Sequence, residues 1–266
     1  MGGKLPLAYL PDLRLNYADE GPRDGAPVVF AHALGLDLAM WDQVLPLLPP
    51  GLRLIRYDHR GHGQSDVPAP PYAMGAMIRD AERLLDHLGV KDCVFVGISM
   101  GGLVAQGLAV KRLDLVRGLV LSNTAAKIGH ESQWQARSAA VAAGGMEAVA
   151  DAVMERWFPR RFRAEGLAAP WRDRLLACAP EGYRGGCAAI AGTDFYTPTA
   201  SLTLPALVIA GSEDGSTPAD LVRETADLMA GAEFKLLRPS GHLPPVDAPE
   251  AFAEALSGFL RRIGHI

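Results

Sequence analysis

Short apolar runs alternate with amphipathic stretches along most of the chain. The apolar runs are almost continuous, as in strands of a parallel sheet that is buried on both faces. Only Pro11-Asp12 separates the first two runs, which predicts an opening antiparallel hairpin. The predicted strands are 5–10, 13–17, 27–32, 52–57, 93–96, 118–121, 207–210 and 233–237, and the predicted helices are 76–88, 101–111, 219–229 and 249–262. We therefore expect an α/β fold, in which an eight-stranded, mostly parallel sheet carries helices on both faces.

One region interrupts this alternation between the sixth and the seventh predicted strand. About 80 residues contain no strand-like run there, and a bare loop of that length is uncommon in a compact domain. Helical spacing covers 132–143, 146–157, 171–178 and 184–191. We expect a helical cap at residues 125–199, inserted into a core made of residues 1–124 and 200–266. Trp134, Trp157 and Trp171 all lie in this segment. The alternative interpretation is that these aromatic side chains only form a second small core.

Composition narrows the class of protein. The chain has 266 residues, 49% of them hydrophobic and 21% charged, with a formal net charge of −4. It has no basic run for nucleic acid or a membrane surface, and no apolar run long enough to span a membrane. The three cysteines are an odd number, and no apolar leader precedes the first strand, so we expect reduced thiols in a cytoplasmic protein. We expect a small-molecule partner, no nucleic-acid or membrane partner, and a monomer or small homo-oligomer.

A Gly-x-Ser-x-Gly motif at residues 97–101 carries the strongest chemical signal. It lies between a predicted strand and a predicted helix, the setting in which this motif forms a nucleophile elbow. Small residues on either side permit the sharp turn that would project the Ser99 hydroxyl out of the sheet. The same turn would direct the Met100 N–H towards developing negative charge. The alternative is a Gly-rich loop with an incidental serine.

A serine nucleophile requires a base, and His242 is the best candidate. His242 follows the last predicted strand, at the carboxyl edge of the sheet where ligands bind in open α/β folds. The chain order of serine first and histidine last also favours it. The competing histidines are His32, His59 and His62 near the same edge, and His87, His130 and His265 elsewhere.

The acid that orients this base is assigned to Asp214, just beyond the strand at 207–210. Glu213 is chemically able but is offset by one position. Some hydrolases place the acid one strand earlier, and this chain has Asn123 in that region and no carboxylate. The absence of a carboxylate there favours Asp214.

Two further loops lie near the expected site. The loop after the strand at 27–32 should provide the second oxyanion donor, which we assign to the Leu34 N–H, with His32 as a hydrogen-bonded scaffold residue. Asp58 and His59 form an alternative acid–base pair, but an ion pair between Asp58 and Arg60 is the structural interpretation that we prefer. No residues have metal-ligand spacing and no phosphate-binding loop is present, so we expect no metal and no cofactor.

Together these features resemble the α/β-hydrolase superfamily over nearly the whole chain. The elbow, the order Ser99, Asp214, His242, and the pattern D-x-R-G-x-G-x-S-D at 58–66 carry this resemblance. Further segments are similar to those of the 3-oxoadipate enol-lactonases, which act in bacterial degradation of aromatic compounds. These segments are 32–37, 40–42, 122–129, Trp134, 145–146, 156–158, 182–183 and 187–190. The chain departs from the family at Ala33, where glycine is usual, and at 241–245.

The resemblance implies hydrolysis of a small lactone that carries a free carboxylate. Trp134 would form a wall over the lactone ring, and Arg137, on the same helical face, would bind the carboxylate. Rival cations are Lys127, His130, Arg160, Arg161 and Arg163. Alternative functions are a general carboxylesterase or thioesterase, a cofactor-free perhydrolase, or a hydrolase-derived receptor that binds without turnover.

Overall fold

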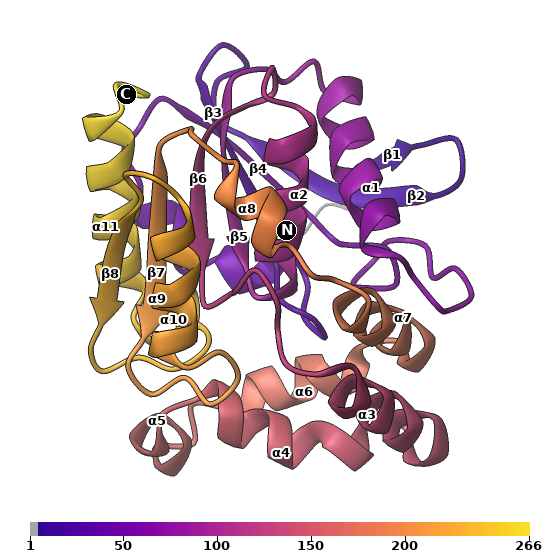
Figure 1. Cartoon of the computed structure of the whole chain (residues 1–266). Helices are drawn as coiled ribbons and strands as arrows, with labels where there is room; N and C mark the ends of the chain where they lie inside the picture. Colours follow the sequence, from indigo (N-terminus) through magenta and orange to yellow (C-terminus); the bar gives the residue numbers. More distant parts are fainter. Residues whose placement is uncertain (1–4) are drawn as a thin grey trace.

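An eight-stranded sheet forms the centre of the molecule (Figure 1). The computed structural model describes residues 5–266. The strands are β1 (Leu7–Tyr9), β2 (Arg14–Glu20), β3 (Ala26–Ala31), β4 (Leu52–Tyr57), β5 (Cys93–Ile98), β6 (Val116–Ser122), β7 (Ala206–Gly211) and β8 (Glu233–Leu237). Their order is β1-β2-β4-β3-β5-β6-β7-β8, with β2 antiparallel to both of its neighbours and the other pairs parallel. The predicted fold class and the opening hairpin are therefore confirmed.

Helices cover both faces of this sheet. Helices α1 (Met74–His87), α2 (Met100–Lys111), α8 (Tyr196–Ala200) and α9 (Ala219–Leu228) pack in sequence against one another along one layer. Helix α11 (Pro249–Arg262) packs with the short turns η1 (Leu38–Trp41) and η2 (Leu45–Leu47). Because α2 lies between β5, β6, α1 and α8, it is apolar on nearly all sides, whereas α1 and α11 each bury one stripe.

Five helices between β6 and β7 gather at one end of the sheet (Figure 1). They are α3 (Glu131–Gly144), α4 (Glu147–Trp157), α5 (Arg160–Ala164), α6 (Ala169–Ala177) and α7 (Pro180–Ala191). The four helices expected in this segment are present, while α5, α8 and α10 (Pro244–Asp247) were not predicted. Helix α8 packs on α2 and α9 although it starts within the predicted cap. The cap boundaries 125–199 stay a prediction, and residues 1–4 of the predicted core lie outside the described residues.

The structure bears on two expectations that came from composition, free cysteines and the absence of a membrane-spanning segment. Cys93, Cys178 and Cys187 are all buried and unpaired, in agreement with the expectation of free thiols. Among the helices of residues 5–266, none combines the length and the apolar character needed to cross a membrane.

The loop after β4 corrects one prediction. The Asp58 carboxylate accepts hydrogen bonds from Asn16 Nδ2 at 2.8 Å and from the backbone N–H groups of Leu38 at 2.7 Å and Gln64 at 2.8 Å. Arg60 instead makes a bidentate ion pair with Asp80 on α1, at 2.6 and 2.7 Å. The predicted Asp58–Arg60 ion pair is therefore wrong. The Asp58 carboxylate accepts hydrogen bonds from backbone N–H groups of two loops, which need an acceptor. The Arg60 side chain instead pairs with Asp80 on α1.

Three histidines form a buried cluster beside this loop. His32 Nδ1 lies 2.7 Å from the Ala33 carbonyl oxygen, and the His59 N–H donates to His32 Nε2 at 2.9 Å, so His32 is the hydrogen-bonded scaffold residue that was expected. The ring of His32 lies 4.4 Å from that of His59 and 5.3 Å from that of His62, between centroids. Burial lowers the pKa of His32 to about 4 and that of His62 to about 3, and lowers that of His59 well below its ordinary value. The cluster is therefore neutral in the folded protein at neutral pH.

This cluster predicts a loss of stability in mild acid. Below pH ~6.5 the unfolded chain protonates these histidines while the folded chain does not, so unfolding takes up protons. As the pH is lowered, the free energy of unfolding should therefore fall by about 1.4 kcal/mol per pH unit for each of these histidines. The substitution His62→Gln should make the free energy of unfolding less dependent on pH between pH 6 and pH 4.5, by the contribution of one histidine. Urea unfolding at each pH measures this dependence. Equal slopes in the two proteins would contradict a neutral buried His62.

Candidate active site

Ser99 occupies a strained turn between β5 and α2. Its backbone angles are φ 53° and ψ −118°, outside the usual regions for a residue other than glycine. If Gly97 had a side chain, its Cβ would lie 2.2 Å from the Gly101 carbonyl oxygen. A Cβ at Gly101 would likewise lie 2.2 Å from the Ala31 carbonyl oxygen. Only glycine permits these contacts, so the spacing of the motif follows from the close approach of β3, β5 and α2. Thr124 Oγ1 also donates to the Ser99 carbonyl oxygen at 2.7 Å.

A cavity of about 490 Å³ lies between the sheet edge and the helices α3, α4 and α7. Ser99, which is 8% exposed, and His242 both line it. The Ser99 hydroxyl makes no hydrogen bond to other groups of residues 5–266, which leaves its Oγ available to a ligand in the cavity. The remaining lining residues are Ala33, Leu34, Ile128, Gly129, Gln133, Trp134, Arg137, Arg156, Trp157, Tyr183, Gly215 and Ser216.

His242 and Asp214 form a buried hydrogen-bonded pair. His242 Nδ1 lies 2.8 Å from Asp214 Oδ2, and the side chains are 2% and 0% exposed. Burial disfavours the charged carboxylate, but His242, the Asn123 amide and the Thr217 N–H together hold the pKa of Asp214 below its ordinary value. An ionised Asp214 favours the proton on Nδ1 and leaves Nε2 free to accept another. Glu213, the rival acid, is exposed.

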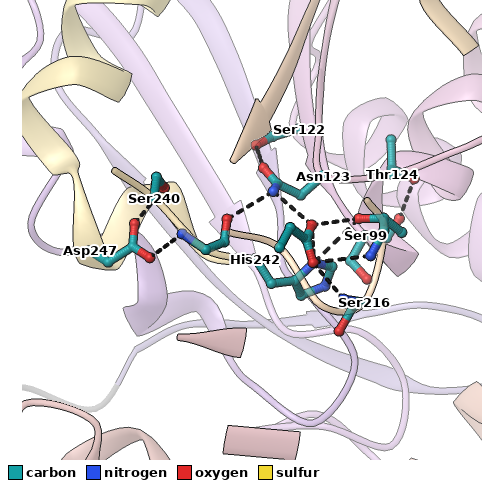
Figure 2. A network of polar contacts seen from close by, with 11 residues as sticks. Ser99, Ser122, Asn123, Thr124, Ser216, Ser240, His242 and Asp247 are labelled. Atoms are coloured by element: carbon teal, nitrogen blue, oxygen red, sulfur yellow. Dashed lines mark hydrogen bonds and ion pairs between the residues drawn. The ribbon is translucent and has the colours of Figure 1, made fainter. Parts of the chain in front are cut away.

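Asn123 contacts both Asp214 and the loop that carries His242 (Figure 2). Its Nδ2 donates to Asp214 Oδ2 at 2.8 Å and to the Gly241 carbonyl oxygen at 3.0 Å, while its Oδ1 accepts from the Ser122 hydroxyl at 2.7 Å. The residue has a left-handed backbone, with φ 47°. The sequence argument considered this position only for its missing carboxylate. The tolerance of asparagine for this conformation, directly after a buried strand, is the signal that would have indicated it.

The loop that carries His242 is also fixed from two other sides. Asp247 accepts from the Ser240 hydroxyl at 2.6 Å and from the Gly241 N–H at 2.7 Å, and burial raises its pKa to about 6 (Figure 2). The His242 N–H donates to the Trp157 carbonyl oxygen at 2.7 Å.

The end of α4 therefore contacts both loops, because the Gly215 N–H beside the acid donates to the Arg156 carbonyl oxygen at 3.0 Å. The last carbonyls of a helix have no partner within it, and here two of them accept from the acid and base loops. A predicted cap helix is thus hydrogen-bonded to the site itself.

The two expected oxyanion donors have free N–H groups. Within residues 5–266 neither the Leu34 N–H nor the Met100 N–H donates to a protein acceptor. Their side chains lie near each other, since a Cβ at Gly186 would meet Leu34 Cδ1 at 2.4 Å and Met100 Sδ at 3.2 Å. Ala33 does not have a positive φ, so alanine fits this loop without backbone strain. The donor role of these groups stays a prediction.

Trp134 and Arg137 face the same cavity, as their spacing predicted. The Arg137 guanidinium carbon lies 4.6 Å from the centroid of the Trp134 ring, whose Nε1 donates to the Ile128 carbonyl oxygen at 2.6 Å. The rival cations do not line the cavity. Lys127 pairs with Asp194, Arg161 pairs with Glu165, Arg163 donates to the Phe158 carbonyl oxygen, and His130 and Arg160 are exposed.

Sequence reasoning included Arg156 and Tyr183 in segments that resemble the family but gave them no role in the cavity, which both residues line. Arg156 lies in the last turn of α4, directly before Trp157, and its position depends on how the helices pack. No group of three or more His, Cys, Asp or Glu side chains in the described part of the chain could hold a metal ion.

Comparison with known proteins gives consistent similarities. The chain is 34% identical over 253 residues to 3-oxoadipate enol-lactonase 2 of Acinetobacter baylyi, with 94% of each chain covered. Among solved structures, an enol-lactonase from Burkholderia xenovorans LB400 aligns with a TM-score of 0.92 and 35% identity, covering 96% of this chain and all of that one. A hydrolase from Pseudomonas aeruginosa aligns with a TM-score of 0.93 and 37% identity, covering 98% of this chain and 99% of that one.

The family model described as the alpha/beta hydrolase fold matches residues 26–249, from the start of β3 to the start of α11. This range contains the elbow, the Asp214–His242 pair and all five helices that gather at the end of the sheet. The chain belongs to the alpha/beta hydrolase fold family.

Proposed function

We propose that this hydrolase opens a small anionic lactone, 3-oxoadipate enol-lactone, to 3-oxoadipate. The observation that carries the proposal is a single cavity that contains both Ser99 with His242 and the uncompensated cation Arg137. The first pair suits ester cleavage, and the cation suits a substrate with a free carboxylate. The similarity to enol-lactonases from two organisms supports this substrate.

In the first step His242 Nε2 takes the proton of the Ser99 hydroxyl as its Oγ attacks the lactone carbonyl carbon. The Leu34 and Met100 N–H groups stabilise the resulting oxyanion, a contribution of about 3–4 kcal/mol per donor. When the intermediate collapses, the ring C–O bond breaks and the enol oxygen leaves with the proton from His242. The product of this step is an ester of Ser99, and the released enol tautomerises to a ketone.

In the second step a water molecule gives its proton to His242 Nε2 and attacks the Ser99 ester. Collapse of the second intermediate returns the proton to Ser99 Oγ and releases a carboxylate. Asp214 keeps the Nδ1 proton in place throughout and stabilises the protonated imidazole. The chemistry requires only these side chains and water.

The cap contributes to substrate recognition. Trp134 forms an apolar wall of the cavity, and stacking on its ring orients the Arg137 guanidinium. Arg137 has no carboxylate partner in the described chain, so its charge is available to the carboxylate of the lactone. An arginine fork binds a carboxylate through two parallel hydrogen bonds.

Ser99→Ala should abolish hydrolysis of the enol-lactone. Loss of a nucleophile of this type lowers kcat by about 10⁴-fold or more. A spectrophotometric assay of lactone opening measures the effect. Ser216→Ala is the matched control, because Ser216 lines the same cavity and its N–H bond to Asp214 survives the substitution. Equal activity in wild type and Ser99→Ala would exclude Ser99 as nucleophile.

Arg137→Ala should raise the KM for the enol-lactone by about tenfold or more, the value of a charge-assisted hydrogen bond. Steady-state kinetics on the lactone test this, with Arg160→Ala as a control for loss of an exposed positive charge outside the cavity. If Arg137→Ala leaves both KM and kcat unchanged, Arg137 does not bind the substrate.

A further inference from the structure

Arg156 is a second cation in the same cavity. It is half-buried and, within residues 5–266, pairs with no carboxylate. Three other arginines of the cap helices have acidic partners. Arg161 pairs with Glu165, Arg172 with Glu147 and Asp151, and Arg174 with Asp37. Arg160, Arg163 and Arg184 also make no ion pair within residues 5–266, but of the unpaired arginines of these helices only Arg137 and Arg156 line the cavity that contains Ser99.

Arg137, Arg156 and Tyr183 all line this cavity. Burial lowers the pKa of Arg156, and the positive charge of Arg137 lowers it further. Burial raises the pKa of the Tyr183 phenol, while the charges of Arg137 and Arg156 both oppose that shift. Two like charges without a counter-ion repel each other, and this repulsion is strong where water is partly excluded. An anion placed between the two guanidinium groups would remove it.

We propose that Arg137, Arg156 and the Tyr183 hydroxyl form one binding site for a single substrate carboxylate, in which Arg156 is a specificity-determining residue. The proposal rests on the proposed function, since that carboxylate is the one carried by the lactone. The site would be built from three helices, because Arg137 lies on α3, Arg156 on α4 and Tyr183 on α7.

The position of Arg156 fixes this carboxylate site relative to the reacting atoms. The Arg156 carbonyl oxygen accepts from the Gly215 N–H at 3.0 Å, and the next carbonyl, of Trp157, accepts from the His242 N–H at 2.7 Å. The backbone that carries the cation is therefore bonded directly to the acid and base loops. A cavity of about 490 Å³ with Ile128 and Trp157 in its walls suits a small organic anion.

A matched pair of esters tests the proposal without requiring the lactone. Mono-p-nitrophenyl adipate and p-nitrophenyl hexanoate have acyl chains of equal length and differ in a terminal carboxylate or methyl group. We expect wild type to favour the adipate ester in kcat/KM. Arg156→Gln should reduce that preference by about tenfold or more, the value of one charge-assisted hydrogen bond. The rate with the hexanoate ester should stay within about threefold of wild type, which shows that the variant is folded.

Further variants separate the specific contact from general charge. Arg160→Gln removes an exposed cation of the adjacent helix and should keep the wild-type preference. Arg156→Lys keeps the charge but not the planar fork, so it should retain part of the preference. Tyr183→Phe should lower the preference with little change for the hexanoate ester. An unchanged preference in Arg156→Gln, or an equal loss in Arg160→Gln, would overturn the proposal.

The outcomes also distinguish this proposal from the proposed function. If both p-nitrophenyl esters are cleaved with the expected preference and the enol-lactone is not, the carboxylate site stands and the lactone substrate is wrong. If the enol-lactone is cleaved well and Arg156→Gln keeps the full preference, the function stands and the role of Arg156 is wrong.

Discussion

The Asp214 carboxylate is buried, and its two oxygens accept hydrogen bonds from five donors. Oδ1 accepts from the N–H groups of Ser216 and Thr217 at 2.7 and 3.0 Å, and Oδ2 accepts from Asn123 at 2.8 Å, the Thr217 hydroxyl at 2.7 Å and His242 at 2.8 Å. An isolated carboxylate would not stay charged at this depth, so these donors are a condition for an ionised acid. They come from three segments of chain, after β6, after β7 and after β8. The buried charge thus fixes the relative positions of these loops, and with them the orientation of the His242 ring.

The same arrangement joins the cap to the core. Helix α4 presents its last carbonyl oxygens to the Gly215 and His242 N–H groups, and its side chain Arg156 to the cavity. Movement of this end of α4 would break hydrogen bonds to the acid and base loops. Helix α4 also carries a cation that lines the cavity, so under the proposed function one helix would serve both recognition of an anionic substrate and the positioning of His242. Helix α4 therefore both lines the cavity and holds the loops that carry Asp214 and His242.

The sequence allowed most of the framework to be predicted, because its strands are short apolar runs and helices such as α1 and α11 have a clear apolar stripe. Helices α5, α8 and α10 were missed since five residues or fewer do not establish a helical period. The elbow and the order of Ser99, Asp214 and His242 follow from local motifs and chain order. The Asp58–Arg60 pair was wrong because neighbours in sequence on a loop need not face each other. Arg156 and Tyr183 could not be assigned, since their contacts depend on how distant loops and helices pack.

We propose that the cavity binds a small anionic lactone, which would distinguish this chain from a general esterase. A general esterase requires only the nucleophile, base and oxyanion donors, and would accept a small activated neutral ester readily. In a cavity whose arginines have no carboxylate partner, binding energy comes instead from their contacts with a substrate carboxylate. The most direct measurement compares kcat/KM for 3-oxoadipate enol-lactone and for p-nitrophenyl acetate on the same enzyme preparation. Our account predicts the higher value for the enol-lactone, and faster turnover of p-nitrophenyl acetate would contradict it.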